Sequence, residues 1–76
     1  MTNRDENLGL KRSVVALVDE GKRPYSLHTE VFTDDGHFHQ LVCATFLNGP
    51  AELVVYHDSA QAARVLHFLK TGQRVG

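Results

Sequence analysis

The fold is decided by the stretch at positions 25–57, which reads YSLHTEVFTDDGHFHQLVCATFLNGPAELVVYH. This stretch contains three segments rich in β-branched and aromatic residues, at 25–33, 37–47 and 51–57. Asp34-Asp35-Gly36 separates the first two segments and Asn48-Gly49 separates the last two. Both separators are typical of turns between paired strands. The stretch therefore predicts a three-stranded antiparallel meander.

Two-residue turns at Asp35-Gly36 and at Asn48-Gly49 predict the strand register. The first turn places Val31 opposite Gln40, and the second places Val42 opposite Val55. One face of the sheet is then mainly apolar, and we expect it to face the core: Tyr25, Leu27, Val31, Phe38, Val42, Ala44, Phe46, Leu53 and Val55. A three-residue turn with a bulge at Gly36 is the alternative, and it would shift the first hairpin by one residue.

The C-terminal segment predicts an amphipathic helix over 59–71. Asp58 precedes it as an N-cap with Gln61 three residues later, and Gly72 follows it as a C-terminal glycine. Its apolar residues recur at helical spacing, with Phe68 beside them: Ala62, Val65, Leu66 and Leu69. We expect this helix to pack on the apolar face of the sheet.

Segment 8–20 fits two structures. As a helix it aligns Leu10, Val14 and Leu17 on one side, and Gly21 with Pro24 follows as a stop signal. As a strand it benefits from its β-branched valines. The helix is favoured, so the predicted fold class is α+β with the order α-β-β-β-α and a C-terminal helix on one sheet face. The alternative order is ββββα.

Composition predicts one small globular domain over 1–76, with flexible ends at 1–7 and 72–76. Of the residues, 42% are hydrophobic and 22% are charged, which excludes wholesale disorder. The formal net charge of −1 disfavours a strongly basic nucleic-acid binder. Cys43 is the only cysteine, and the longest apolar run, at 14–18, is far too short to span a membrane. We therefore expect a cytoplasmic protein without a membrane partner.

The expected order of elements resembles that of double-stranded RNA-binding domains, over most of the chain and without shared motifs. That family carries a lysine-rich signature at the start of its last helix, where ammonium groups meet phosphates. Here the corresponding segment, 58–64, reads DSAQAAR, so it begins with a carboxylate and holds one arginine. The resemblance makes weak nucleic-acid binding an alternative function, and the departure from the signature disfavours it.

The second sheet face collects the candidate chemistry. Strand alternation places His39 and Cys43 on it, with His28 opposite Cys43 and with Glu30 nearby. Imidazole and thiolate are ligands that zinc prefers, so His28, His39 and Cys43 form a candidate metal site. His28 and Cys43 could equally form a base and a nucleophile, but no elbow or oxyanion hole accompanies them. We predict no catalytic residue and no cofactor, with metal binding as an alternative function.

The same face also retains large apolar side chains. In the expected registers it carries four of them, Phe32, Leu41, Val54 and Tyr56, which we predict to be the anchors of a partner-binding surface. His28, His39 and Glu30 would supply its polar contacts. The third strand would be an edge without lysine, open to pairing. If instead the helix at 8–20 covers this face, the domain has three ordinary layers. The favoured function is a small non-enzymatic interaction module, a regulator, adaptor or inhibitor, that forms a homodimer or binds another protein.

Overall fold

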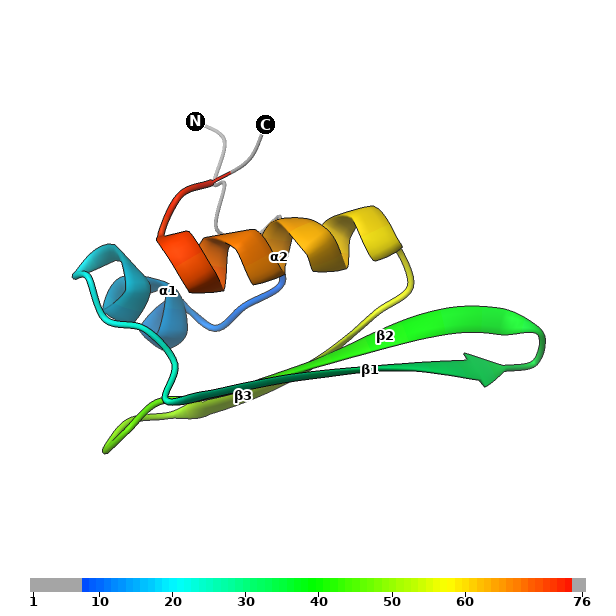
Figure 1. Ribbon diagram of the computed structural model, residues 1–76, viewed down its shortest axis with the longest axis horizontal. Coiled ribbons are helices and arrows are strands. Elements are labelled where there is room, and N and C mark those ends of the chain that lie inside the picture. The colour runs from blue at the N-terminus through cyan, green and yellow to red at the C-terminus, as the bar shows by residue number, and fades with distance from the viewer. Residues whose placement is uncertain (1–7, 75–76) are drawn as a thin grey trace.

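The computed structural model describes residues 8–74, and the helices and strands follow in the order α1 (Arg12–Asp19), β1 (Ser26–Asp34), β2 (His37–Thr45), β3 (Ala51–Tyr56) and α2 (Ser59–Thr71). The strands form one antiparallel sheet in the order β1-β2-β3, and both helices lie on the same side of it (Figure 1). The predicted α+β fold and the helix in segment 8–20 are confirmed, and the ββββα alternative is wrong. Of the predicted flexible ends, 1–7 and 72–76, residues 1–7 and 75–76 lie outside the described residues, whereas residues 72–74 are described.

Helix α2 begins and ends where the sequence predicts. The Asp58 carboxylate accepts a hydrogen bond from the Ala60 N–H at 2.8 Å, which satisfies a free donor of the first turn. Gly72 ends the helix with a φ of 79°, and its N–H donates to the Phe68 carbonyl at 2.7 Å. Gln61 accepts from Arg64 on the helix surface. The buried side chains of α2 are Ala62, Val65, Phe68 and Leu69.

Helix α1 is held by a buried carboxylate from the sheet. Its N-cap residue, Lys11, has no capping side chain of its own. Instead the Lys11 N–H donates to Oε1 of Glu52 at 2.6 Å, and the Lys11 ammonium lies 3.7 Å from the second carboxylate oxygen. A negative charge at a helix N-terminus is favourable because the helix dipole is positive there. Glu52 thereby joins α1 to β3.

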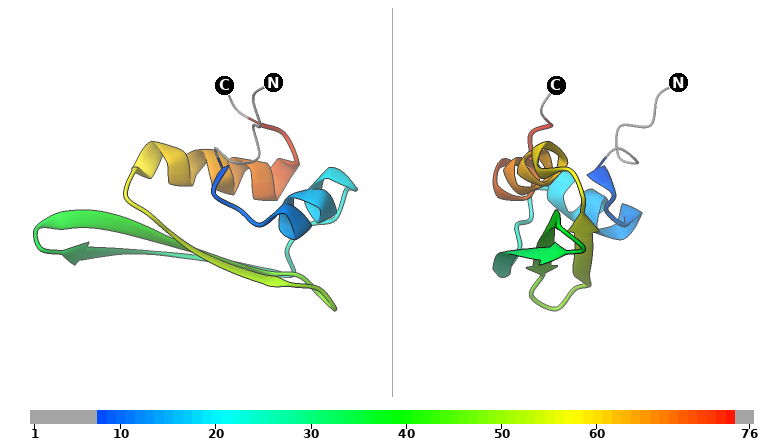
Figure 2. Two further views of the ribbon diagram at one scale, coloured as in Figure 1. Left: turned by 180° about the vertical axis from the view of Figure 1, so that it is seen from behind. Right: turned by 90° about the vertical axis from the view of Figure 1, so that its right-hand side faces the viewer.

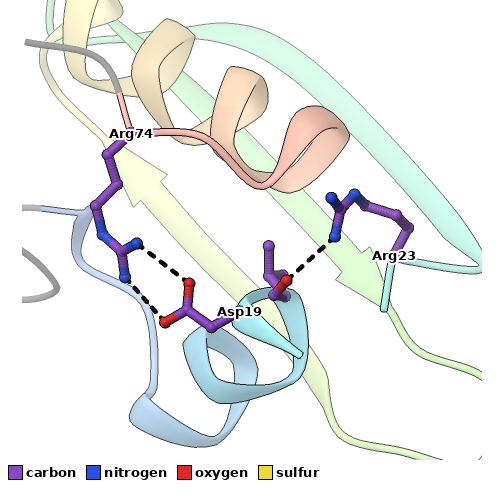
Figure 3. A network of polar contacts seen from close by, with 4 residues as sticks. Asp19, Arg23 and Arg74 are labelled. Atoms are coloured by element: carbon purple, nitrogen blue, oxygen red, sulfur yellow. Dashed lines mark hydrogen bonds and ion pairs between the residues drawn. The ribbon is translucent and has the colours of Figure 1, made fainter. Parts of the chain in front are cut away.

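Two arginines make polar contacts that connect the C-terminal ends of α1 and α2 (Figure 3). The Arg23 guanidinium donates to carbonyls from both helices, at 3.2, 3.2 and 2.8 Å: Val18, Lys70 and Thr71. Arg74 donates to both carboxylate oxygens of Asp19 at 3.1 Å, and its guanidinium lies 4.9 Å from the centre of the Phe68 ring. These contacts connect the end of α1 to the end of α2.

The first hairpin has the predicted register. Asp34 lies opposite His37, Val31 lies opposite Gln40, and the turn residues Asp35 and Gly36 have φ values of 52° and 79°. Positive φ at both central residues defines a type I′ turn, whose twist matches that of the strands. The alternative with a bulge at Gly36 is wrong.

The second hairpin differs from the prediction by one residue. Val42 lies opposite Val54, not Val55, and five residues connect the strands because the turn is centred on Leu47 and Asn48. A two-residue turn at Asn48-Gly49 would need an N–H at position 50 to close on the Leu47 carbonyl, and Pro50 has none. The turn therefore closes one residue earlier, with the Gly49 N–H donating to the Phe46 carbonyl at 3.1 Å.

This shift exchanges the two faces of β3. Val54 and Tyr56 point toward the helices, with Val54 packed against the core and Tyr56 only 6% exposed. Leu53 and Val55, predicted to be core residues, point away from the helices and are exposed. The prediction that Val54 and Tyr56 lie on the second sheet face is therefore wrong, because a one-residue change of register turns every side chain of a strand over.

The predicted core face is only partly covered. Val42, Ala44 and Phe46 are buried under the helices. Val31 and Phe38 belong to the same face but are exposed, because the turn end of the β1–β2 hairpin extends past α2 (Figure 1). The core thus occupies about half the length of the longer strands, and the turn end of the hairpin has solvent on both sides.

Candidate interaction surface

The sheet face opposite the helices is open. Both views in Figure 2 place α1 and α2 together on one side of the sheet, and no described segment crosses the other side. The alternative in which the helix at 8–20 covers this face is therefore wrong. The domain has two layers, and the second sheet face is in contact with solvent across the described part of the chain.

The observed registers arrange the open face as three neighbouring rows across the strands. The rows are His28–Cys43–Leu53, then Glu30–Leu41–Val55, then Phe32–His39 with His57 just beyond the end of β3. The β1 positions are mainly polar, while the β2 and β3 positions of the first two rows are mainly apolar. The surface is thus divided along its length into a polar strip and an apolar strip.

Four large apolar side chains on this face form what we call the apolar patch: Phe32, Leu41, Leu53 and Val55. Leu53 is 66% exposed, Val55 is 44% exposed and Phe32 is 41% exposed, while Leu41 is half-buried between its neighbours. A cluster of exposed apolar side chains on adjacent strands is typical of interaction surfaces, since isolated exposed residues need no partner. Two members of the patch, Phe32 and Leu41, were predicted from the sequence.

The polar strip follows β1. His28 and Glu30 are both exposed, and Nε2 of His28 lies 3.4 Å from Oε1 of Glu30. These two side chains border the apolar patch on the side of the β1 edge. They occupy the positions predicted for polar contacts, and a contact at this distance between exposed groups contributes little to the stability of the fold itself.

His39 extends the patch as an aromatic side chain. Its ring stacks on Phe32 with a centroid distance of 5.3 Å and meets the His57 ring edge-on at 4.6 Å. Its Nδ1 atom is buried and has no hydrogen-bond partner among the described residues. The ring is therefore held in place by packing against Phe32 and His57, so that all three rings form one continuous surface at the end of the apolar patch.

The two predicted anchors on the other face have structural roles. The Tyr56 hydroxyl donates to the Leu8 carbonyl at 2.6 Å within the core. Burial, with the nearby charge of Glu52 as a smaller cause, raises the pKa of Tyr56 to about 12. Val54 packs against the core cluster. Leu53 and Val55 lie on the open face instead of Val54 and Tyr56. The sequence signal that could have predicted this is Pro50, which prevents a two-residue turn at Asn48-Gly49.

The candidate metal ligands are not gathered into a site. His28 and Cys43 are opposite each other, as predicted. His39 lies further along the sheet, in contact with Phe32 and His57. Among residues 8–74, no group of three or more His, Cys, Asp or Glu side chains is placed to hold a metal ion.

Two of the basic residues that could contact phosphate, Lys11 and Arg23, are engaged in the fold. Lys11 lies at Glu52, and Arg23 donates to carbonyls at the ends of both helices. These residues stand at opposite ends of α1, so they do not form one basic strip. At the start of α2, Asp58 caps the helix with its carboxylate, where the double-stranded RNA-binding domains carry lysines.

Comparison with known protein families, characterised proteins and solved structures finds no match to this chain. Neither helix in the described part of the chain is long and apolar enough to cross a membrane. The open sheet face is the most distinctive surface of the described part of the chain.

Proposed function

We propose that this chain is a small non-enzymatic interaction module that binds a protein partner through the open sheet face and acts as a homodimer. A regulator, an adaptor or an inhibitor would each use such a surface. The observation that carries the proposal is the exposure of the apolar patch, Phe32, Leu41, Leu53 and Val55, on a face that neither helix covers.

The energetics favour a partner on this face. Complete burial of one leucine, valine or phenylalanine side chain contributes about 1.5–3 kcal/mol. Leu53 and Val55 are neighbours of Leu41 and Cys43 across the strands, so one complementary surface can bury them together. Their backbones are already ordered in the sheet, and therefore binding requires little additional loss of conformational entropy.

The polar residues beside the patch add specificity. His28, Glu30 and His39 can donate or accept hydrogen bonds at the border of the apolar contact, where groups remain partly hydrated. The partner suited to this surface is a protein with an apolar centre and polar groups along one side. The expected location for such an encounter is the cytoplasm.

The test is recovery of the partner from the native cell by affinity purification with mass spectrometry, using the wild type and two variants. Leu53→Asp places a charge on the most exposed side chain of the apolar patch, and we expect it to weaken binding at least about 100-fold. Phe38→Asp is the matched control, since Phe38 is 73% exposed on the helix side of the sheet. It should retain the partner.

The fold of each variant is checked by circular dichroism and thermal unfolding before the comparison. A partner that is lost with Leu53→Asp and kept with Phe38→Asp supports the proposed surface. A partner that binds the folded Leu53→Asp variant as tightly as the wild type contradicts it.

A further inference from the structure

Strand β1 is a long edge without the usual protection against pairing. It runs for nine residues, Ser26–Asp34, and lies at one side of the sheet. Its sequence, SLHTEVFTD, holds no proline, lysine or arginine, and every residue except Leu27 is exposed. Natural edge strands are commonly short, bulged, or protected by proline or lysine. The other edge, β3, is shorter and directly follows Pro50.

The type I′ turn determines which backbone groups of β1 face outward. In a two-residue hairpin the residues beside the turn, here Asp34 and His37, exchange hydrogen bonds, and bonded pairs then alternate along the strands. Phe32, Glu30 and His28 therefore bond to β2. The intervening residues, Leu27, Thr29 and Val31, direct their N–H and C=O groups away from the sheet.

We propose that a second copy of this chain pairs with β1 in antiparallel orientation, with the two-fold axis at Thr29. This inference deepens the proposed function, because it names the surface that forms the homodimer. In this register Thr29 lies opposite its own copy, and His28 of each chain lies opposite Glu30 of the other. On the helix side, Leu27 lies opposite Val31 of the other chain.

Complementary side chains favour this register. Nε2 of His28 and Oε1 of Glu30 already lie 3.4 Å apart along one strand. Pairing about Thr29 places the imidazole of each chain directly opposite a carboxylate of the other, which can accept its N–H, and this is a favourable cross-strand arrangement. An axis at Glu30 would place two carboxylates opposite each other, and like charges directly opposite are destabilising. An axis at His28 would place Glu30 opposite Ser26, so no imidazole would face a carboxylate.

The pairing also buries apolar surface and satisfies the backbone. Val31 is exposed on the helix side and would lie beside Leu27 of the other chain. The outward groups of Leu27, Thr29 and Val31 would form about six inter-chain hydrogen bonds in this pattern. The resulting sheet has six strands, with all four helices on one side. Both apolar patches remain on the opposite side for the partner proposed above.

Space on the helix side permits this arrangement. Helix α2 packs mainly over β2 and β3 and leaves β1 largely uncovered. A two-fold axis perpendicular to the sheet would keep the helices of both chains on the same side. Neighbouring strands lie about 4.8 Å apart, so several strand widths would separate the two α2 helices, more than the 8–10 Å at which helices pack.

The test is disulfide trapping in a Cys43→Ser background, which removes the only native thiol. Thr29→Cys would place two cysteines at a Cα separation of about 5.5 Å across the dimer axis, within the range that a disulfide bridges. Val31→Cys is the matched control, with the same outward backbone orientation. Its two copies would lie roughly 14 Å apart, a distance set by the rise of the strand.

We expect mild oxidation to cross-link Thr29→Cys and not Val31→Cys, while an equal mixture of Leu27→Cys and Val31→Cys forms the mixed dimer. The proposal is overturned if Val31→Cys cross-links to itself as fast as Thr29→Cys. It is also overturned if the folded Thr29→Cys variant yields no cross-linked dimer at a concentration where the wild type sediments as a dimer.

A charge exchange provides a second readout without cysteine. Glu30→Lys and His28→Asp should each raise the dimer dissociation constant about tenfold. Combining the two changes again places an acidic side chain opposite a basic one across the axis and should recover most of the affinity. If the combined variant is as weak as the single variants, the register is refuted.

The outcomes separate this inference from the proposed function. Failure of edge cross-linking together with loss of the partner in Leu53→Asp would refute the β1 pairing and leave the open face as the binding surface. Cross-linking at Thr29 together with partner binding that Leu53→Asp leaves unchanged would support the β1 pairing. It would also refute the proposal that the open sheet face binds the partner.

Discussion

Replacement of Tyr56 by phenylalanine tests the register of β3. The Tyr56 hydroxyl donates to the Leu8 carbonyl at 2.6 Å, and both residues are buried in the core. Tyr56→Phe keeps the ring and removes the donor, so the Leu8 carbonyl loses its hydrogen bond in a place with little access to water. The register places this residue under the helices, whereas a two-residue turn at Asn48-Gly49 would place it on the open face.

The expected loss of stability is about 1–2 kcal/mol, which combines the lost hydrogen bond with the cost of a buried acceptor left unsatisfied. For a domain of this size that corresponds to a fall of roughly 5–15 °C in Tm. Urea and thermal unfolding followed by circular dichroism measure it. The matched control is Leu53→Ala, because Leu53 is 66% exposed and its truncation should change stability by no more than about 0.5 kcal/mol.

The reverse pattern would refute the reasoning. A Tyr56→Phe variant as stable as the wild type, together with a Leu53→Ala variant destabilised by more than about 1 kcal/mol, would mean that the faces of β3 are exchanged. The same register also predicts that Tyr56→Asp unfolds the domain. That variant therefore cannot serve as a selective test of partner binding.

Three further predictions follow from the core and the helix ends. Because the pKa of Tyr56 is raised to about 12 in the folded state, the free energy of unfolding should fall as the pH rises from about 10 to 12. Urea unfolding at each pH measures this fall, and Tyr56→Phe should lack the part of the pH dependence that comes from Tyr56. Glu52→Ala should cost about 1–3 kcal/mol in urea unfolding because the Lys11 N–H loses its acceptor, and a loss below about 0.5 kcal/mol would contradict that role. Gly72→Ala should lower the free energy of unfolding by about 1 kcal/mol, since a residue with a Cβ is strained at a φ of 79° and the added Cβ would also displace the end of the Arg23 side chain; an unchanged Tm would refute this strain.

Local signals made much of the fold predictable. Asp35-Gly36 determines a type I′ turn, and the whole register of the first hairpin follows from it. Asp58 and Gly72 mark the two ends of α2 because each satisfies backbone groups that the helix leaves free. Such signals depend on the chemistry of one or two residues, and distant parts of the chain do not change them.

The second hairpin shows where a local signal was misread. Asn48-Gly49 resembles a two-residue turn, but Pro50 cannot donate the hydrogen bond that would close it. The turn therefore begins one residue earlier, at Phe46, and Asn48 becomes its third residue with a φ of 58°. The consequence was an exchange of Leu53 and Val55 with Val54 and Tyr56 between core and surface. Phe32 and Leu41 were unaffected, because their face depends on the first turn alone.

The side of the sheet on which α1 packs could not be predicted. The valines of α1 could cover either apolar face, and both faces of the sheet carry large apolar side chains. The decision depends on contacts between distant segments, above all the Lys11 N–H to Glu52 and the Tyr56 hydroxyl to Leu8. These contacts become apparent only when the register of β3 is known.

Cys43 offers the most direct test of the open face as a binding surface. It is the only cysteine, half-buried on that face between His28 and Leu53. The measurement is the rate of thiol alkylation of Cys43 in the purified chain and in the complex recovered from the native cell, followed by mass spectrometry. A docked partner should slow the alkylation of Cys43 at least about tenfold, since the reagent reaches the thiol only when the partner dissociates or the interface opens locally. Equal rates in the free chain and in the complex would contradict the proposal that this face binds the partner.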